Sequence, residues 1–225
     1  MIVVTGASKG IGNAIAKKLH EDGKNVLGLA RTSFKAEFSS MSVDVTSMEE
    51  LQHVAHEIRM QEGSISGLIN CAGIASMNLA LMTPESTTRR LIETNLLGTI
   101  FSCQIFSRLI IRNGGGSVIN FSTIAVPLGL SGEAIYVASK AGVEGFSRVL
   151  ARELSGHNIR VNCISPGPIS TDLIKGISED KLAIITGQQI IRRQFEISDV
   201  TDVVQLLLDR KATSISGETI HIGGV

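Results

Sequence analysis

The chain lacks an excess of positive or negative charge and has few cysteines. Each of these features excludes some classes of partner or binding site. Its 225 residues include 21 basic and 21 acidic side chains, so no surplus of one sign indicates nucleic acid or an anionic membrane as a partner. The three cysteines are odd in number and widely spaced. They predict buried thiols in a reducing compartment rather than a disulfide framework. The five histidines show no ligand spacing with them, so we expect no metal site.

Long hydrophobic runs and targeting segments are also lacking. No apolar run approaches the length of a membrane span, so no membrane contact is expected. Met1 leads directly into Ile2-Val3-Val4, without a basic and apolar leader. No repeat, low-complexity tract or linker interrupts the chain. We therefore expect a cytoplasmic protein with a single domain over residues 1–225, long enough to bury a substantial core.

What the chain has is a regular alternation of apolar β-branched runs and helical patterns. Strands that are apolar throughout, each followed by a helix, predict a parallel sheet covered on both faces. The fold class is therefore α/β, a Rossmann-like doubly wound sheet of about seven strands in three α/β/α layers. The expected strands lie near residues 2–5, 25–30, 41–43, 67–71, 117–121, 159–164 and 218–222, and the helices near 11–21, 48–61, 84–112, 135–154 and 200–209.

The first expected turn from strand to helix is rich in glycine. It runs Thr5-Gly6-Ala7-Ser8-Lys9-Gly10-Ile11-Gly12. Its glycines allow a tight turn and close backbone approach, while the following helix points free N–H groups at an anion. The spacing differs from the Gly-x-Gly-x-x-Gly dinucleotide fingerprint, but the position in the fold is the required one. The turn is therefore predicted to hold phosphates.

Two basic residues beside this turn favour one dinucleotide. The second expected strand is followed by Arg31, where an NAD site usually has an acidic residue for the ribose 2′-hydroxyl. A cation there accommodates a 2′-phosphate instead, and Lys9 lies in the glycine turn. Together they predict NADP(H). The alternative is that Arg31 merely starts a solvated loop.

Tyr136 and Lys140 are four residues apart in the longest expected helix. Their side chains would share one helix face and could serve one reacting centre. A nearby ammonium favours the phenolate, so we expect Lys140 to lower the pKa of Tyr136 and make it a usable proton donor. Taken alone, the pair is also typical of a solvated helix face.

The order and spacing of several motifs resemble the short-chain dehydrogenase/reductase family across essentially the whole chain, and most closely bacterial 3-oxoacyl-[acyl-carrier-protein] reductases. The motifs are the glycine turn, Asp44-Val45, Asn70-Cys71-Ala72-Gly73, Asn95, Tyr136 with Lys140, and Pro166-Gly167.

The resemblance implies a role for each motif. Tyr136 would donate a proton to the developing alkoxide, Lys140 would hold the ribose as well, and Asn95 would anchor a proton relay. A hydroxyl residue before Tyr136 would hold the carbonyl oxygen. The cofactor would contact Gly6, Ser8, Lys9, Gly10, Ile11, Gly12, Arg31, Asp44, Val45, Asn70, Ala72, Gly73, Ile169 and Thr171. Other roles remain open: Asn95 as the polar residue of a helix kink, and Asp44 and Thr171 in caps or turns.

The hydroxyl residue is where the chain departs from the family. The family's serine usually lies thirteen residues before the tyrosine, and Thr123 occupies that position, with Ser122 one residue earlier. Neighbouring residues that leave a strand face opposite ways, so the two are not expected to serve together. We favour Thr123, because Gly129 and Gly132 keep the family's spacing up to Tyr136.

Three further departures from the family concern the cover of the sheet, the docking of a carrier protein and the oligomeric state. Residues 32–40 are too short for the family's helix, which predicts a less covered sheet flank. His157 stands where carrier-protein reductases often have arginine, leaving Arg89, Arg90, Arg192 and Arg193 to compensate. The family forms dimers or tetramers, so we expect a homo-oligomer. The chain stops directly after Gly223-Gly224-Val225, which leaves the contacts of its last strand open.

The sequence thus predicts an NADPH-dependent carbonyl reductase. Its substrate would be a small molecule or a carrier-protein-linked 3-oxoacyl thioester of fatty acid biosynthesis. A ketoreductase or dehydrogenase for a sugar, steroid or polyketide intermediate is the alternative within the enzyme class. A catalytically silent NADP-binding protein is the alternative outside it.

Overall fold

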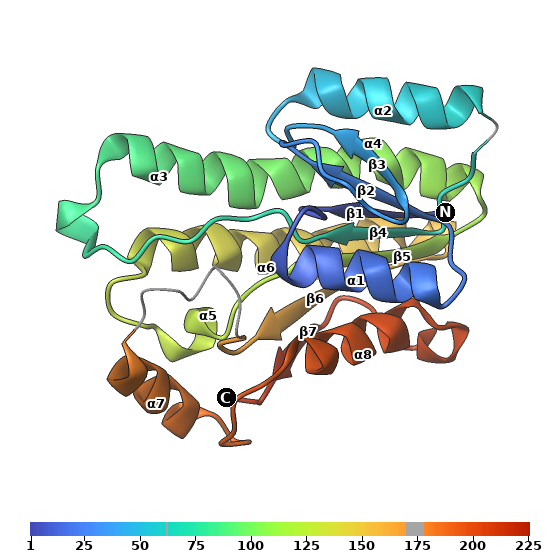
Figure 1. The fold of residues 1–225 in the computed structure, drawn as a ribbon. Helices are drawn as coiled ribbons and strands as arrows, with labels where there is room; N and C mark the ends of the chain where they lie inside the picture. The colour runs from blue at the N-terminus through green and yellow to red at the C-terminus, as the bar shows by residue number, and fades with distance from the viewer. Residues whose placement is uncertain (62, 170–177) are drawn as a thin grey trace.

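Seven parallel strands form the centre of the molecule (Figure 1). The computed structural model describes residues 1–61, 63–169 and 178–225. The strand order is β3-β2-β1-β4-β5-β6-β7, and it reverses between β1 and β4, the switch point at which such sheets bind ligands. The strands are β1 (Ile2–Thr5), β2 (Val26–Ala30), β3 (Ser39–Ser42), β4 (Gly67–Asn70), β5 (Gly116–Phe121), β6 (Ile159–Pro166) and β7 (Thr219–Ile222).

Helices cover both faces of this sheet. On one face lie α1 (Gly10–Glu21) and α8 (Ile197–Leu208), and on the other α2 (Met48–Met60), α4 (Gly98–Arg112) and α6 (Ala134–Leu154). Successive strand residues point to opposite faces, so Val4 packs in the core with α1 and α8, whereas Val3 packs in the core with α2 and α4. The predicted three-layer α/β/α fold is confirmed. The connections include α5 (Ala125–Leu128), α7 (Glu179–Gln188) and the 3₁₀ turns η1 (Ala80–Met82), η3 (Ser155–His157) and η5 (Arg210–Ala212).

The single helix expected over residues 84–112 has three parts. It begins as α3 (Glu85–Leu91), widens into a π-helical segment η2 (Ile92–Leu97) and continues as α4. By length and composition alone, the helical stretch Glu85–Arg112 could cross a membrane. This contradicts our prediction that no apolar run approaches the length of a membrane span. However, 56% of the window that passes is buried. Because α4 packs against α2, β4 and β5, its apolar side chains belong to the core.

The flank beside β2 is better covered than predicted. Residues 31–38 contain no helix, as expected. However, Phe34 and Phe38 from this loop pack over Gly28 of β2, where a Cβ would lie 2.6 Å from Phe38 Cε2. Phe38 is buried in the core cluster of α1 and α8. Two aromatic rings therefore do here what a helix would do, and Gly28 makes room for them.

Candidate active site

Tyr136 and Lys140 lie one turn apart on the buried face of α6. Their side chains are almost covered, with exposures of 8% and 5%. The Lys140 ammonium donates a hydrogen bond of 2.8 Å to the backbone oxygen of Phe121, the last residue of β5. The pair therefore stands at the carboxyl end of the sheet, where the phenol of Tyr136 faces the segment that follows β5.

The two neighbouring hydroxyl residues after β5 have different partners. Ser122 donates to the Glu144 carboxylate of α6 at 2.5 Å. The Thr123 hydroxyl accepts a hydrogen bond from the Ala125 N–H at 3.3 Å, and its interaction with the Tyr136 phenol acts to lower the pKa of that phenol. The two neighbours therefore have different partners, and the hydroxyl that interacts with the tyrosine is that of Thr123; its catalytic role stays a prediction.

The electrostatics of the pair differ from our expectation. Burial raises the pKa of Tyr136 to about 12, while its hydrogen bond with Thr123 acts in the lowering direction. Burial also lowers the pKa of Lys140 to about 8. The predicted lowering of the tyrosine pKa by lysine is thus not present in this structure. The reason is that the phenolate loses its hydration, whereas the ammonium is turned toward the Phe121 carbonyl.

Asn95 is fully buried within the π-helical segment η2. Its Oδ1 accepts from the Ile74 N–H at 2.8 Å, and its Nδ2 donates to the Ile74 oxygen at 2.9 Å and to Ser139 Oγ at 3.0 Å. The side chain therefore joins the segment after β4 to α6. A Cβ on Gly73 would lie 3.2 Å from Asn95 Oδ1 and 3.5 Å from Lys140 Nζ, so Gly73 lies close to both. The helix distortion we considered is present.

The glycine turn packs against the residues after β4. Gly6 adopts φ +70, and a Cβ there would lie 2.8 Å from the backbone of Ala72. A Cβ on Gly12 would lie 2.5 Å from the Gly6 oxygen. Lys9 is the N-cap of α1, no side chain caps the helix, and its first turn has no acidic residue. Backbone N–H groups at such a helix start can receive an anion, so the residues present fit a dinucleotide phosphate.

Thr5 also helps to hold this turn, which the sequence reasoning did not single out. Its hydroxyl accepts a hydrogen bond from the Ala72 N–H at 3.2 Å. A buried threonine ending a strand that is otherwise Ile-Val-Val was the available signal.

The residues predicted for the adenine and ribose lie beyond β2 and β3. Arg31 is exposed at the end of β2. Asp44 Oδ1 accepts from Thr46 N and Oγ1, so this carboxylate closes the turn considered as its alternative role. Val45 is buried against Gly98 of α4, where a Cβ would lie 2.7 Å from Val45 Cγ2.

The Asn70 side chain is not among the residues that line the central cavity, and its predicted contact with the cofactor stays a prediction. Its Nδ2 donates to Asn120 Oδ1 at 2.8 Å and to Cys103 Sγ at 3.3 Å. These groups lie in the core beneath α4, because strand alternation turns Asn70 away from the site. Ile169 is buried and pairs with Phe195, while Thr171 lies outside the described residues.

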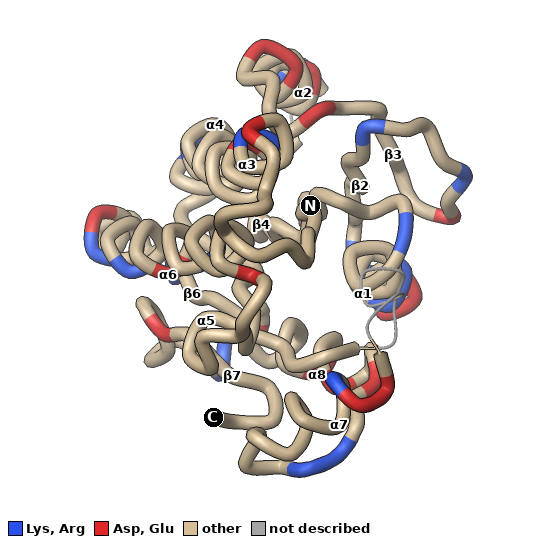
Figure 2. The backbone as a smooth tube through the Cα atoms, turned by 90° about the vertical axis from the view of Figure 1, so that its left-hand side faces the viewer, with Lys and Arg blue, Asp and Glu red and all other residues tan. Residues whose placement is uncertain are grey.

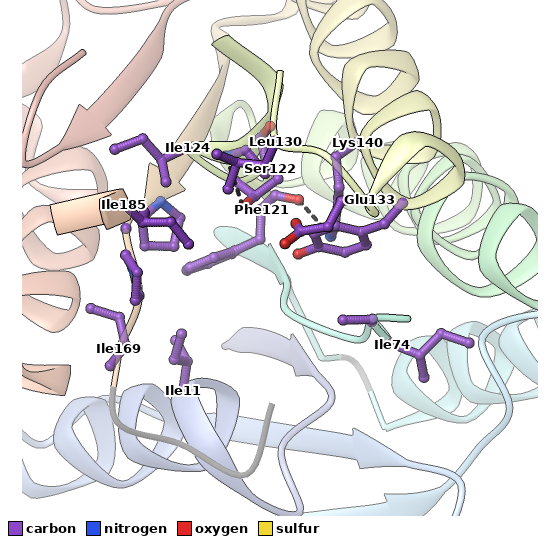
Figure 3. Close-up of a pocket in the computed structure, with 18 of the residues that line it drawn as sticks. Ile11, Ile74, Phe121, Ser122, Ile124, Leu130, Glu133, Lys140, Ile169 and Ile185 are labelled. Carbon is purple, nitrogen blue, oxygen red and sulfur yellow. Dashed lines mark hydrogen bonds between the residues drawn. The ribbon is translucent and has the colours of Figure 1, made fainter. Parts of the chain in front are cut away.

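A cavity of about 380 Å³ connects these parts (Figure 3). Figure 3 shows Glu133 and Lys140 on one side of it, with Ile11, Ile74 and Ile169 on the other sides. Most of its wall is apolar or small. The remaining lining residues are Cys71, Gly73, Ala75, Ser76, Met77, Phe121, Ser122, Thr123, Ile124, Ala125, Leu130, Tyr136, Pro166, Gly167, Pro168 and Ile185.

Several lining residues were not predicted from the sequence, and two of them bear on the chemistry of the cavity. Glu133 precedes Tyr136 by three residues, a helical spacing that was a usable signal. Ile185 comes from α7, where it is the one residue buried among those of this helix. No sequence pattern indicated it. The cavity thus offers a phenol and a hydroxyl to one oxygen of a ligand, at the carboxyl ends of β4, β5 and β6.

Known proteins resemble this chain over nearly its full length. A family model described as enoyl-(acyl carrier protein) reductase matches residues 6–224. The 3-oxoacyl-[acyl-carrier-protein] reductase of Staphylococcus epidermidis is 36% identical, over 99% of this chain and 96% of that protein. The one from Escherichia coli K12 is 33% identical, over 99% and 95%.

Solved structures agree with the sequence matches. The ligand-free aldohexose dehydrogenase of Thermoplasma acidophilum superposes with a TM-score of 0.91 at 27% identity, covering 99% of this chain and 92% of that one. A short-chain dehydrogenase/reductase from Mycobacterium ulcerans gives a TM-score of 0.91 at 26% identity, covering 98% and 87%. The chain therefore belongs to the short-chain dehydrogenase/reductase family of oxidoreductases.

Proposed function

We propose that this protein is an NADPH-dependent reductase of carbonyl groups, with a 3-oxoacyl thioester as its first substrate. The observation that carries the proposal is that Thr123 and Tyr136 line the same mainly apolar cavity, with the Thr123 side chain interacting with the phenol. Two hydroxyls that converge there can both bind the oxygen on which negative charge develops during reduction. The 3-oxoacyl-[acyl-carrier-protein] reductases among the relatives support this substrate class and a role in fatty acid biosynthesis. We propose a cytoplasmic location for it.

In this mechanism Tyr136 is the proton donor. Its pKa of about 12 keeps the phenol protonated at neutral pH. Transfer of this proton then depends on the substrate oxygen, which becomes more basic than the phenolate as the alkoxide forms. Thr123 orients the phenol and shares the substrate oxygen. Lys140 would hold the ribose of the cofactor, and Asn95 holds the adjoining backbone while the proton is replaced. NADPH, when bound, supplies the hydride.

The cofactor would be held by the glycine turn and by the residues after β2. The uncapped start of α1 suits phosphates, and Arg31 with Lys9 suits the 2′-phosphate of NADP(H). We expect Arg31→Ala to weaken NADPH binding about tenfold and to leave NADH binding nearly unchanged. Titration of nicotinamide fluorescence measures both. Tighter binding of NADH than NADPH by the wild type would overturn the assignment.

The substrate test compares thioesters with free ketones. We expect kcat/KM for an acetoacetyl thioester to exceed that for sugars and simple ketones, and Tyr136→Phe to lose at least about 10²-fold of it. Failure on every thioester together with turnover of an aldose would favour the alternative, a dehydrogenase for another metabolite. The similarity to aldohexose dehydrogenase supports that alternative. Cofactor binding without turnover of any carbonyl would favour a silent NADP-binding protein.

Fewer observations support acyl carrier protein as the carrier of the substrate than support the 3-oxoacyl thioester itself. Two of the four arginines considered for docking already have acidic partners: Arg89 binds Glu85 at 2.7 Å, and Arg193 binds Asp199. Figure 2 shows basic and acidic segments interspersed around the backbone. We propose that any such docking rests on Arg90 and Arg192, and that the protein forms a homodimer or homotetramer. Light scattering measures the assembly.

A further inference from the structure

Glu133 places a carboxylate in a cavity wall that otherwise has little charge. Among the described lining residues, only Glu133 and Lys140 carry formal charge. The Lys140 ammonium is bound to the Phe121 oxygen. Glu133 is 8% exposed, and Figure 3 shows its side chain on the Lys140 side of the cavity. A ligand in this space therefore meets a negative charge close to the proton donor.

A cation of α7 stands farther out than this carboxylate. Lys181 Nζ lies 3.8 Å from Glu133 Oε1, and it also donates to the Ser131 oxygen at 3.5 Å. The Lys181 side chain is 31% exposed, against 10% for that of Glu133. Water screens the more exposed ammonium of Lys181. This ammonium therefore only partly offsets the negative charge of Glu133 that a ligand in the cavity would experience.

The field of Glu133 reaches the position of the reaction. The carboxylate acts to raise the pKa of the Tyr136 phenol, the group that a substrate carbonyl would meet. Burial raises the pKa of Glu133 itself, while Lys181 acts in the opposite direction. A second negative charge brought into the cavity would be repelled at short range, with few polar groups to screen it.

We propose that Glu133 excludes anionic carbonyl compounds from the cavity, so that a β-keto ester or thioester is accepted and the corresponding free β-keto acid is rejected. This inference rests on the proposed function and narrows its substrate class. Glu133 acts here as a specificity-determining residue. Its effect is on the charge beside the reacting carbonyl rather than on the transfer of hydride or proton.

The test compares a matched pair of ligands in two variants. The variants are expected to change the acid-to-ester ratio of kcat/KM in opposite directions. The ligands are methyl acetoacetate, which is neutral, and acetoacetate, the carboxylate anion of the corresponding free β-keto acid. Glu133→Gln removes the repelling charge and should raise the acid-to-ester ratio of kcat/KM about tenfold. Lys181→Met removes the compensating cation and should lower that ratio. Glu153→Gln, an exposed site farther along α6, is the control and should leave it unchanged.

The ratio separates the proposal from a general loss of activity. Any change in the Tyr136 pKa affects both ligands alike and cancels. The same comparison is made by calorimetric binding of each ligand to the NADP⁺-saturated enzyme, which requires no turnover. Opposite shifts of the binding ratio without any turnover would support the filter while refuting the proposed function. Two results would overturn the proposed exclusion of anions while leaving the proposed function intact. One is turnover of the ester with an unchanged acid-to-ester ratio in Glu133→Gln. The other is a shift of this ratio in the same direction in both variants.

Discussion

At the scale of single residues, Tyr136 is held protonated by its surroundings. Burial is the largest cause of its raised pKa, the Glu133 carboxylate adds to it, and the hydrogen bond with Thr123 opposes it. The chain contains no tryptophan and no other tyrosine. Ionisation of this phenol can therefore be followed directly by near-ultraviolet absorbance of the whole protein.

This gives a residue-scale prediction. The wild type should show a phenol pKa of about 12. Thr123→Val should raise it further, because the hydrogen bond that favours the phenolate is lost, and carbonyl reduction should fall about 10²-fold. Ser122→Ala is the matched control, since its hydroxyl binds Glu144. It should change neither the pKa nor turnover by more than about twofold. Loss of turnover in Ser122→Ala but not in Thr123→Val would reverse the assignment.

At the scale of elements, the site depends on how the turn between β1 and α1 meets the segment after β4. Gly6 and Gly10 both have positive φ, but their surroundings differ. A Cβ on Gly6 would lie 2.8 Å from Ala72, whereas one on Gly10 would have no atom of the described residues within 4 Å. Only Gly6 is therefore required both by its backbone angle and by the neighbouring chain.

We predict different effects of alanine at these two glycines. Gly10→Ala should cost about 1–2 kcal/mol in free energy of unfolding, from the left-handed backbone alone. Gly6→Ala should cost more, at least about 2 kcal/mol, because the turn must also move away from Ala72. Urea unfolding measures stability, and cofactor titration should show the larger loss of affinity for Gly6→Ala. Equal effects of the two substitutions would contradict this account.

At the scale of the whole molecule, buried thiols link stability to pH. Burial raises the pKa of Cys103 to about 12 and that of Cys163 to about 11, and it raises that of Cys71 as well. Unfolded cysteines lose their protons near pH 8.5–9, while the folded protein keeps them. Stability therefore falls as pH rises above about 9. Lys140 acts in the opposite sense, because its folded pKa of about 8 lies below the unfolded value.

The cysteines outnumber this single lysine, so their effect should prevail. We expect the free energy of unfolding to fall by about 1–3 kcal/mol between pH 9 and pH 10. Cys163→Ala should flatten that slope by about one proton, or about 1.4 kcal/mol per pH unit. Urea unfolding with a reductant present measures both. A stability that is constant or rising over this interval would contradict the prediction.

Local patterns in the sequence were sufficient for most of the fold. Strands and helices alternate because each buries its own apolar face, so β1, β5 and α6 could be placed from neighbouring residues alone. The π-helical segment η2 could not, because Asn95 stabilises it through Ile74, a residue distant in sequence. The cover over Gly28 likewise depends on rings from a loop without helical periodicity.

The candidate site divides in the same way. The residue types and their spacing could be taken from the chain alone: a glycine turn, Tyr136 with Lys140, and a hydroxyl thirteen residues before the tyrosine. The packing of the folded chain was needed to show that Thr123 interacts with the phenol, that Asn70 lies in the core, and that Glu133 lines the cavity. Spacing fixes which side chains share a face of one element, whereas contact, desolvation and the resulting pKa depend on what other elements bring against that face.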